Sequence, residues 1–497
     1  MILGIDLGTT HSLCAYINRD DKPEIIINER GDRLTPSVVY FKSHKEAIVG
    51  ESAYGFGSLN SDNFIENIKR KMGSTFRAVI AGREFTPTEI SSIILRKIKS
   101  YAEQFLNTNI KDIVISVPAY FSHLQRSATK NAAEIAGFNV LKIINEPTAA
   151  ALAYNLFNDK DENILVFDLG GGTLDITLLE YKNRVQRVIA TAGDIHLGGV
   201  DFDNIIVDFL IKHLKKRFNV DISNEPISLY QIKNVAKKAK EDLSSIDSVE
   251  INVPYVAITE KGPVHLRYSL SSTDFEKMSL PILTRIKMIL ENIFKANNIS
   301  PDWVSKIIFV GGSTRIPFVR KLVLDFFANF IDEPHRLLPK ITINPDEAVA
   351  LGAAIYAGIL EGKLKEIEFY DVVSHYLGIE NDNGDFVPIL EPNTPYNTEK
   401  DMIFEVSKES NNDFIKVHIL QSDNKYGKGE LLSLGYFYFD NPKELEEIDI
   451  IFYVDKHGIL HVKAIDLEEG FSKEISIRDF YFENDEKQNR GSKIKIY

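Results

Sequence analysis

Short apolar runs recur along the N-terminal part of the chain, at residues 2–5, 113–117, 164–167 and 307–310. Runs of this kind, without polar alternation, are typical of strands buried on both faces of a sheet. The runs at 2–5 and 164–167 are each followed by Asp-Leu-Gly and a turn of small residues. Two copies of one strand-and-turn pattern predict a duplicated α/β unit whose halves face each other across a cleft.

Helical patterns follow the other two runs in matching order. Segments at 124–136 and 317–327 are helix-like, and each is followed by an Ala-rich helix, around 149–151 and 348–350. This parallel order supports the duplication. Residues 203–300 carry separate helical periodicity and a strand, which predicts a subdomain inserted over the cleft.

Alternation with a period of two dominates beyond residue 372. The segments 415–419, 449–454 and 459–464 each alternate apolar and polar residues, and residues 455–458 between the last two read as a hairpin turn. Several short strands of this kind predict an all-β sandwich.

The patterns divide the chain into consecutive units. We expect an α/β domain over 1–366 with the insertion at 203–300, a linker over 367–372 and a β-sandwich over 373–483. The polar tail over 484–497 is either loose or an edge strand.

Composition narrows the class of protein. The chain has 497 residues with 44% hydrophobic content, enough for more than one domain with a substantial core. No apolar run approaches bilayer length and the sequence begins with a core strand, so we expect a cytoplasmic protein without membrane contact. The net charge of -13 argues against broad binding to nucleic acid. The single cysteine, Cys14, lies in an expected strand, which favours a buried structural thiol.

Residues 167–175 carry the clearest chemistry. Three consecutive glycines allow backbone amides to approach an anion without side-chain obstruction. Asp168 and Asp175 would repel a bare phosphate, so their presence predicts a divalent cation between carboxylate and phosphate, with Mg²⁺ keeping part of its water shell. Alone, the glycines are equally compatible with an ordinary tight turn, but residues 6–12 repeat the design.

A series of motifs identifies a resemblance. The motifs lie at residues 5–10, 117–121, 144–151, 167–175, 193–199, 311–317, 344–348, 377–380, 417–421 and 455–462. Together they resemble the heat shock protein 70 family of DnaK-type chaperones over nearly the whole chain. The short segment after residues 71–74 is similar to the divergent HscC-type branch of that family.

The resemblance implies a fold and an activity. The implied fold is a duplicated actin-like (ribonuclease H-like) ATPase domain followed by an all-β sandwich. The implied protein is an ATP-dependent chaperone whose slow hydrolysis of ATP to ADP regulates the gripping of extended apolar peptide. It implies Mg²⁺, with K⁺ as a further candidate ion. Implied partners are unfolded client polypeptides, a J-domain co-chaperone and a nucleotide exchange factor, and we expect a monomer.

Site residues are carried over from the motifs. Phosphate contacts fall to Thr9, Thr10, Gly171, Gly172, Gly198 and Gly199. Asp6, Glu146 and Asp168 would hold waters around Mg²⁺. Catalysis falls to Lys69, Glu146, Thr173 and Asp175, with Lys69 positioning the attacking water. On composition alone, Lys69 is one of many surface lysines.

The adenosine side departs from the family pattern. Candidate ATP-binding residues there are His11, Lys237, Lys240, Glu241, Ser244, Gly311, Gly312, Ser313, Arg315 and Asp346. Lys237 stands where the family commonly has a ribose-binding Glu, and Glu241 where an Arg often covers adenine. Because they are i and i+4 on one helix, they can form a pair with exchanged charges. We expect ATP binding to survive with altered affinity.

The C-terminal part carries peptide-binding and coupling candidates. The resemblance assigns the peptide pocket to Ile379, Phe404, Ile415 and Val417, although inward residues of any sandwich are apolar. Pro118, Arg126, Lys142 and Asp371 match positions that couple the two domains, with Lys142 near the J-domain contact. No helical lid follows the sandwich in this sequence, either because the protein naturally lacks one or because the sequence is a piece of a longer chain; in both cases we expect weak, rapidly exchanging peptide binding.

Two other functions stay open on the sequence. One is a nucleotide-binding exchange factor or holdase-like module with little ATP turnover, which the changes at Lys237, Glu241 and the linker favour. The other is a sugar kinase of the same fold, because fold alone does not decide function. The C-terminal sandwich argues against a kinase, and retention of Lys69 and Asp168 favours hydrolysis.

Overall fold

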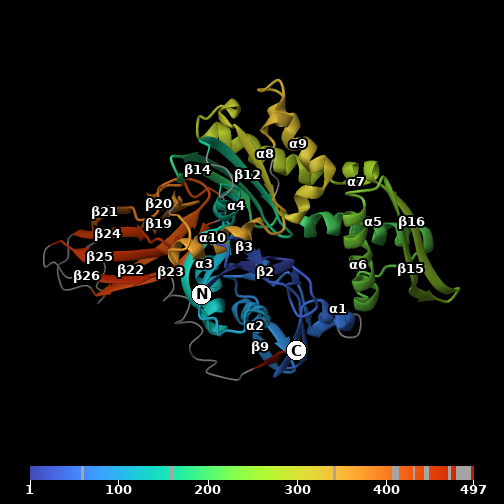
Figure 1. Ribbon diagram of the computed structural model, residues 1–497. Helices are drawn as coiled ribbons and strands as arrows, with labels where there is room; N and C mark the ends of the chain where they lie inside the picture. The colour runs from blue at the N-terminus through green and yellow to red at the C-terminus, as the bar shows by residue number, and fades with distance from the viewer. Residues whose placement is uncertain are drawn as a thin grey trace.

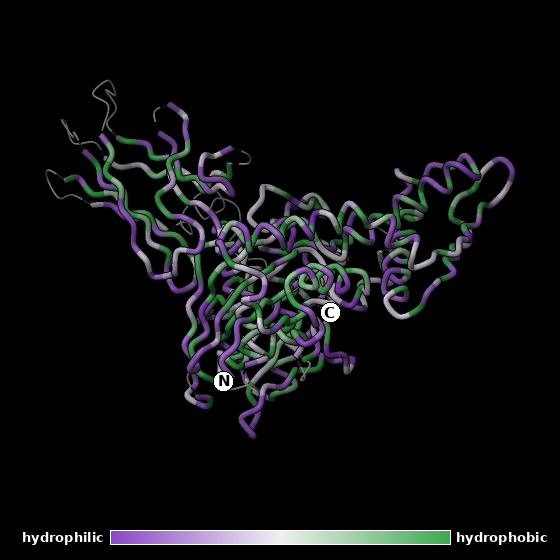
Figure 2. The backbone as a smooth tube through the Cα atoms, turned by 90° about the horizontal axis from the view of Figure 1, so that it is seen from above, coloured by the Kyte–Doolittle hydropathy of each residue, from purple (hydrophilic) through white to green (hydrophobic). Residues whose placement is uncertain are grey.

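The computed structural model describes residues 1–57, 61–155, 160–339, 343–365, 367–381, 383–405, 414–428, 431–440, 447–467, 472–476 and 494–496. Two α/β halves form a central body, from which a C-terminal sandwich and an arm running from α5 (Gly199–Phe218) to β16 (Gly262–Ser271) extend on opposite sides (Figure 1, Figure 2). None of the described helices combines the length and the apolar composition needed to cross a membrane.

The first half is built on a sheet in the order β11-β10-β1-β2-β3, with β4 beside β2. Its elements are β1 (Ile2–Leu7), β2 (His11–Ile17), β3 (Pro23–Ile25), β4 (Thr35–Pro36), β5 (Val39–Ser43), β6 (Glu46–Val49), α1 (Glu51–Gly57), η1 (Ser61–Asn63), β7 (Phe64–Ile65), η2 (Ile68–Lys71), β8 (Ala78–Ile80), β9 (Arg83–Phe85), α2 (Pro87–Leu106), β10 (Asp112–Val117), α3 (His123–Ile135), β11 (Asn139–Asn145) and α4 (Glu146–Asn155). Strands β1 and β2 are antiparallel, and β1 pairs in parallel with β10.

The second half repeats this arrangement in the order β17-β12-β13-β14-β18. Its elements are β12 (Glu162–Leu169), β13 (Leu174–Lys182), β14 (Val185–Asp194), α5 (Gly199–Phe218), α6 (Pro226–Asp242), β15 (Ser248–Thr259), β16 (Gly262–Ser271), α7 (Ser272–Met278), α8 (Leu280–Ala296), η3 (Pro301–Trp303), β17 (Lys306–Val310), η4 (Gly312–Arg315), α9 (Pro317–Phe327), η5 (Pro334–Leu337) and α10 (Ala348–Leu360). As in the first half, an antiparallel hairpin, β12–β13, pairs in parallel with a later strand, β17. The duplication predicted from the apolar runs is therefore present.

Local sequence explains where the interface helix α3 begins. The Ser122 hydroxyl accepts a hydrogen bond from the backbone N–H of Gln125, and the Gln125 side chain accepts one from the N–H of Ser122. This reciprocal pair satisfies two N–H groups that a helix start leaves without partners. It fixes the direction of the chain just after Pro118.

The C-terminal part is a sandwich of two antiparallel sheets, β20-β19-β22-β23 and β21-β24-β25-β26. Its strands, with the linker and the last strand, are β18 (Glu368–Tyr370), β19 (Tyr376–Glu380), β20 (Phe386–Leu390), β21 (Glu399–Glu405), β22 (Phe414–Ser422), β23 (Leu431–Asp440), β24 (Glu447–Val454), β25 (Leu460–Asp466), β26 (Ser472–Ser476) and β27 (Lys495–Ile496). Alternate residues of both sheets meet in one apolar core, as the period-two pattern predicted.

The linker is part of the ATPase-like body rather than a free connection. Strand β18 pairs in parallel with β14 and so extends the sheet of the second half. The sandwich also contacts the first half directly: Leu124 of α3 packs against the sandwich core, and Ile459 of the β24–β25 turn is buried in the core of the first half. The structure is therefore a docked arrangement of the two domains.

Candidate nucleotide site

A polar cleft lies between the two halves, where the turns after β1 and β12 face each other. Its volume is ≈ 320 Å³. The sequence-predicted residues that line it are Asp6, Thr9, Thr10, His11, Lys69, Glu146, Asp168, Gly171, Thr173, Lys237, Lys240, Glu241, Ser244, Gly311, Gly312, Ser313, Arg315 and Asp346. Four further predicted residues, Gly172, Asp175, Gly198 and Gly199, are not in this lining. Gly172 lies against Thr9, and Gly198 and Gly199 lie against Gly171.

The glycine turns of the cleft are locked to one another by backbone contacts. The N–H of Gly199 donates to the carbonyl of Gly170 at 2.9 Å, and the Ser313 hydroxyl donates to the same carbonyl at 2.8 Å. A Cβ atom on Gly171 would collide with the side chain of Thr10. Gly311 has a positive φ of 79° and lies against the Leu169 carbonyl, so a side chain is excluded there as well. The turns can therefore approach one another this closely only because glycine has no side chain at these positions. We call this arrangement the glycine cradle.

Buried carboxylates gather around one buried lysine at the floor of the cleft. The Lys69 ammonium donates to Glu146 at 2.6 Å, and both residues are under 10% exposed. Burial, reinforced by Glu146, raises the pKa of Asp6 to about 7 and that of Asp168 well above its ordinary value. Burial opposes the charge on Lys69, but Glu146 and Asp6 outweigh it and raise the lysine's pKa. Lys69 is therefore no surface lysine.

Asp175 stands behind this cluster with one oxygen unused. Its Oδ1 accepts the backbone N–H of Tyr120 at 2.9 Å, while its Oδ2 is buried and has no partner among the described residues. Burial, with Glu146, raises its pKa to about 7. Within the described chain, no three His, Cys, Asp or Glu side chains can hold a metal ion directly. A surplus of buried carboxylate with an orphaned oxygen fits a hydrated cation such as Mg²⁺, bound through its waters.

Two charged residues at the site were missed by the sequence reading. Arg70, next to Lys69, donates to the carbonyl of Gly172 at 3.0 Å and forms an ion pair with Asp201. Asp203 lines the cleft and binds the Lys240 ammonium at 2.8 Å. Asp201 and Asp203 both lie in the first turns of α5, directly after the Gly198-Gly199 pair. This spacing is the sequence feature that could have identified them.

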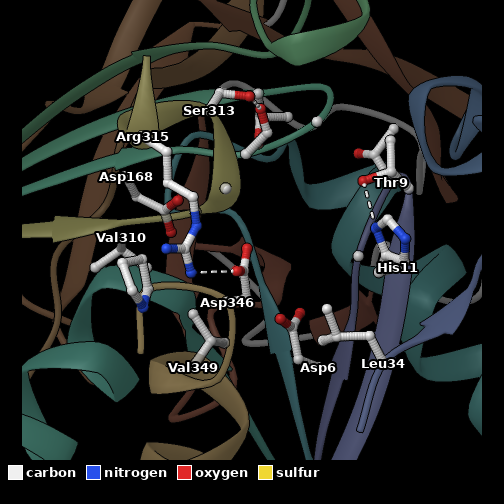
Figure 3. Close-up of a pocket in the computed structure, with 18 of the residues that line it drawn as sticks. Asp6, Thr9, His11, Leu34, Asp168, Val310, Ser313, Arg315, Asp346 and Val349 are labelled. Atoms are coloured by element: carbon white, nitrogen blue, oxygen red, sulfur yellow. Dashed lines mark hydrogen bonds and ion pairs between the residues drawn. The ribbon is translucent and has the colours of Figure 1, made fainter. Parts of the chain in front are cut away.

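The adenosine-side candidates line the same cleft, and Figure 3 labels His11, Ser313, Arg315 and Asp346 among them. Arg315 donates to Asp346 at 2.7 Å. The Lys237 ammonium lies 3.4 Å from the Tyr54 hydroxyl. Burial opposes the charge on Lys237, but Tyr54 and then Glu241 outweigh it and raise the pKa of the lysine. Burial, with Lys237, lowers the pKa of His11 to about 4, so this imidazole is neutral at pH 7.

A comparison with models of protein families identifies the family of this chain. The family model for Hsp70 protein matches residues 2–81 and 77–493. This chain belongs to the Hsp70 family. The predicted fold, an actin-like ATPase domain followed by a β-sandwich, is thereby confirmed. Members of the Hsp70 family are chaperones with ATPase activity that bind ATP or ADP and unfolded polypeptides.

The residues predicted to bind peptide lie within the core of the Hsp70 sandwich. Ile379 and Val417 are under 6% exposed, and Phe404 and Ile415 are partly buried against the same core. Ile379, Ile415 and Val417 come from one sheet and Phe404 from the other. All four belong to or pack against one apolar core, which is also what any sandwich requires.

The residues predicted to couple the domains lie around the docked linker. Arg126 donates to the carbonyl of Ala119 at 3.0 Å and to Asn145 Oδ1 at 2.7 Å. Lys142 donates to the carbonyl of Lys456 in the sandwich and lies 4.9 Å from the Phe369 ring of the linker.

Pro118 and Asp371 complete this set. Pro118 is buried and begins the turn that leads to α3, accepting the N–H of Phe121 at 3.2 Å. Asp371 of the linker accepts the hydroxyl hydrogen of Thr148 at 2.7 Å. In this docked arrangement, Lys142 is 7% exposed and faces the sandwich and linker rather than solvent.

Proposed function

We propose that this Hsp70 protein hydrolyses ATP in the cleft and that hydrolysis controls the binding and release of extended apolar segments by the sandwich. The observation that carries the proposal is helix α4. Its first residue, Glu146, accepts the hydrogen bond of Lys69 in the cleft, and two residues later Thr148 donates to Asp371 in the linker. One rigid helical turn therefore joins the chemistry to the interdomain connection.

The groups of the cleft suit phosphoryl transfer to water. The glycine cradle and the hydroxyls of Thr9 and Thr10 would offer donors to the phosphates. Mg²⁺, when bound, supplies charge neutralisation of those phosphates through its water shell. Lys69, already held by Glu146, would orient the attacking water and offset developing negative charge, and Thr173 would lie beside it. Asp175 Oδ2 would accept from that water network.

The coupling follows from which contacts cross the domains. A change of charge at the phosphates would shift Glu146, and because Glu146 and Thr148 lie on one helix, the shift would alter the hydrogen bond from Thr148 to Asp371. Asn145, just before the helix, is hydrogen-bonded to Arg126. Because coupling between two sites is reciprocal, peptide in the sandwich would in turn alter hydrolysis. We infer that the docked arrangement is the nucleotide-triphosphate state and that hydrolysis releases β18 from β14. A J-domain protein would then engage the region of Lys142 after undocking, and an exchange factor would renew ATP.

Single-turnover ATP hydrolysis tests the proposal, with and without an extended apolar peptide. Lys69→Ala is compared with Lys71→Ala, an exposed lysine of the same short helix η2. We expect slow hydrolysis in the parent protein, acceleration by peptide, loss in Lys69→Ala and an unchanged rate in Lys71→Ala. Tight ATP binding without turnover in the parent protein would instead indicate a nucleotide-dependent binding module.

A further inference from the structure

Strand β27 lies far from the sandwich that precedes it in the chain. Residues Lys495 and Ile496 pair in parallel with Glu46 and Ala47 of β6. Figure 1 shows this strand in red against the blue elements of the first half, beside α2 and β9. The sheet of this subdomain runs β27-β6-β5-β7, so residues 494–496 cover its edge.

The segment is held by apolar packing as well as by the ladder. Ile494 is 8% exposed and belongs to the core cluster that contains Phe41, Ala47 and Val49. Ile496, two residues on, is partly buried against the same cluster, as the period of a strand requires. Strand β27 also contacts α2. The alternate side chains of an Ile-x-Ile segment, Ile494 and Ile496, therefore both pack against the core at this edge.

We propose that the outer edge of β6 is a peptide-addition site on the ATPase domain, with residues 494–496 as its resident strand. Such a site takes an extended segment: main-chain hydrogen bonds give affinity, and pockets for alternate side chains give selectivity. The ligand class is an extended Ile-x-Ile peptide in parallel orientation. An uncovered edge would expose the N–H and C=O groups of β6 for pairing with other chains, so the resident strand also closes a route to aggregation.

The pairing is short, which makes the resident strand exchangeable. Its ladder covers two residues, so its occupancy depends on the effective concentration that the connection to the sandwich supplies. A free peptide of the same sequence then competes poorly with the intact chain and binds readily once the resident strand is displaced.

The site is connected to the cleft through a shared core. Ile494 belongs to the same core cluster as Ile68, the first residue of the lysine-bearing helix η2, and Met72, which follows that helix; η2 also contacts α2. Occupancy of the edge therefore supports the segment that carries Lys69. The proposal stands on strand pairing and burial alone and does not depend on ATP hydrolysis.

Amide hydrogen exchange of residues 46–49 tests the site. Full-length Ile494→Asp is compared with Ile258→Asp, the same change at an isoleucine that is 84% exposed on β15. We expect exchange in residues 46–49 to rise at least about 10-fold in Ile494→Asp, because an edge strand without its partner loses ladder protection. The Ile258→Asp protein should match the parent.

A labelled peptide with the sequence of residues 492–497 then tests exchange of the occupant. We expect it to bind Ile494→Asp at least about 10-fold more tightly than the parent, and to restore protection at residues 46–49. A peptide of reversed sequence should not restore it. Protection that rises only in β19 or β22 would place the peptide in the sandwich and overturn the proposal. Unchanged exchange at residues 46–49 in Ile494→Asp would overturn it as well, and dimerisation of the variant would identify a second copy as the preferred occupant instead.

Discussion

The nucleotide cleft and the sandwich core differ in how far their residues reveal a role. In the cleft, charged side chains such as Lys69 and Asp168 are buried at a cost that folding alone does not explain. In the sandwich, Ile379 and Val417 are buried apolar residues, which any sandwich needs. A buried charge therefore indicates function by itself, whereas a buried aliphatic residue indicates a core until binding is measured.

The largest effect that separates the two regions is on stability. Ile379→Ala should lower the free energy of unfolding by about 2–5 kcal/mol, because it removes fully packed methyl groups and leaves a cavity. Ile403→Ala, at an isoleucine that is 54% exposed on β21, should cost far less. Denaturant unfolding of both full-length variants provides the comparison. Equal stabilities, with peptide affinity lost only in Ile379→Ala, would show that Ile379 is a binding residue and not a core residue.

In the cleft, by contrast, we expect a substitution to impair activity while it increases stability. Asp168→Asn should slow single-turnover hydrolysis by about 10²–10³-fold, because it removes a carboxylate that positions the hydrated cation. The nucleotide-free variant should nevertheless be more stable than the parent at pH 8. Burial raises the pKa of Asp168, so the folded state binds more protons than the unfolded state and the parent loses stability as pH rises above about 4.

Melting temperatures between pH 5 and pH 8 check this sign. The fall in stability with rising pH should be smaller in Asp168→Asn than in the parent. Asp302→Asn, at an exposed aspartate of η3, is the control and should follow the parent in both hydrolysis and stability. A variant that is less stable than the parent at pH 8 would contradict the account of a carboxylate buried at a cost.

The interface between the two regions should respond to acid. Burial lowers the pKa of both His123 and His375 to about 3. Both lie at the interface: the His123 backbone N–H donates to Gln421 of the sandwich, and the His375 ring lies 4.3 Å from that of Tyr120 in the first half. Their contribution to docking is complete above about pH 6.5 and declines as pH falls toward 3. At pH 5, each should cost docking up to about 2 kcal/mol.

Small-angle X-ray scattering of the parent protein at pH 7.5 and pH 5 measures this effect. We expect a larger radius of gyration at pH 5, and a smaller change in a His123→Gln, His375→Gln double variant. His335→Gln, at an exposed histidine, should respond as the parent does. An identical radius at both pH values would exclude the histidines as a constraint on docking.

The smallest expected effect is at the adenosine end of the cleft. Lys237→Gln should change ATP affinity by less than about 1 kcal/mol, because the ammonium makes a long 3.4 Å contact with the Tyr54 hydroxyl and lies 5.5 Å from the centre of the Tyr54 ring, both weak interactions. The pKa of His11 should rise, since Lys237 helps to lower it. Calorimetric titration with ATP and imidazole NMR measure the two. Complete loss of ATP binding would show that Lys237 has taken over an essential ribose contact.

Local pattern predicted much of the fold, and distant pairing accounts for what it missed. The apolar runs at 113–117 and 164–167 became β10 and β12, because a strand buried on both faces needs such a run. The linker strand β18 was not predicted as a ladder member, and an edge strand was only one of two alternatives for the polar tail that contains β27. Each is short, and its partner lies far away in sequence, in β14 and β6 respectively.

In the candidate site, too, residues with a local sequence pattern were predicted and residues defined by distant partners were not. Gly171 and Asp168 were found because a glycine turn with flanking carboxylates has a meaning of its own. Arg70 and Asp203 were missed because their importance comes from partners across the cleft, Gly172 and Lys240. The orphaned oxygen of Asp175 likewise becomes visible only when its surroundings are known.

The most direct test of the account is the effect of peptide on single-turnover ATP hydrolysis in Thr148→Val. This substitution removes the hydroxyl that donates to Asp371 and leaves Glu146 and Lys69 in place. We expect basal hydrolysis to persist while acceleration by an extended apolar peptide is lost. Acceleration equal to that of the parent would contradict the claim that helix α4 joins the cleft to the sandwich.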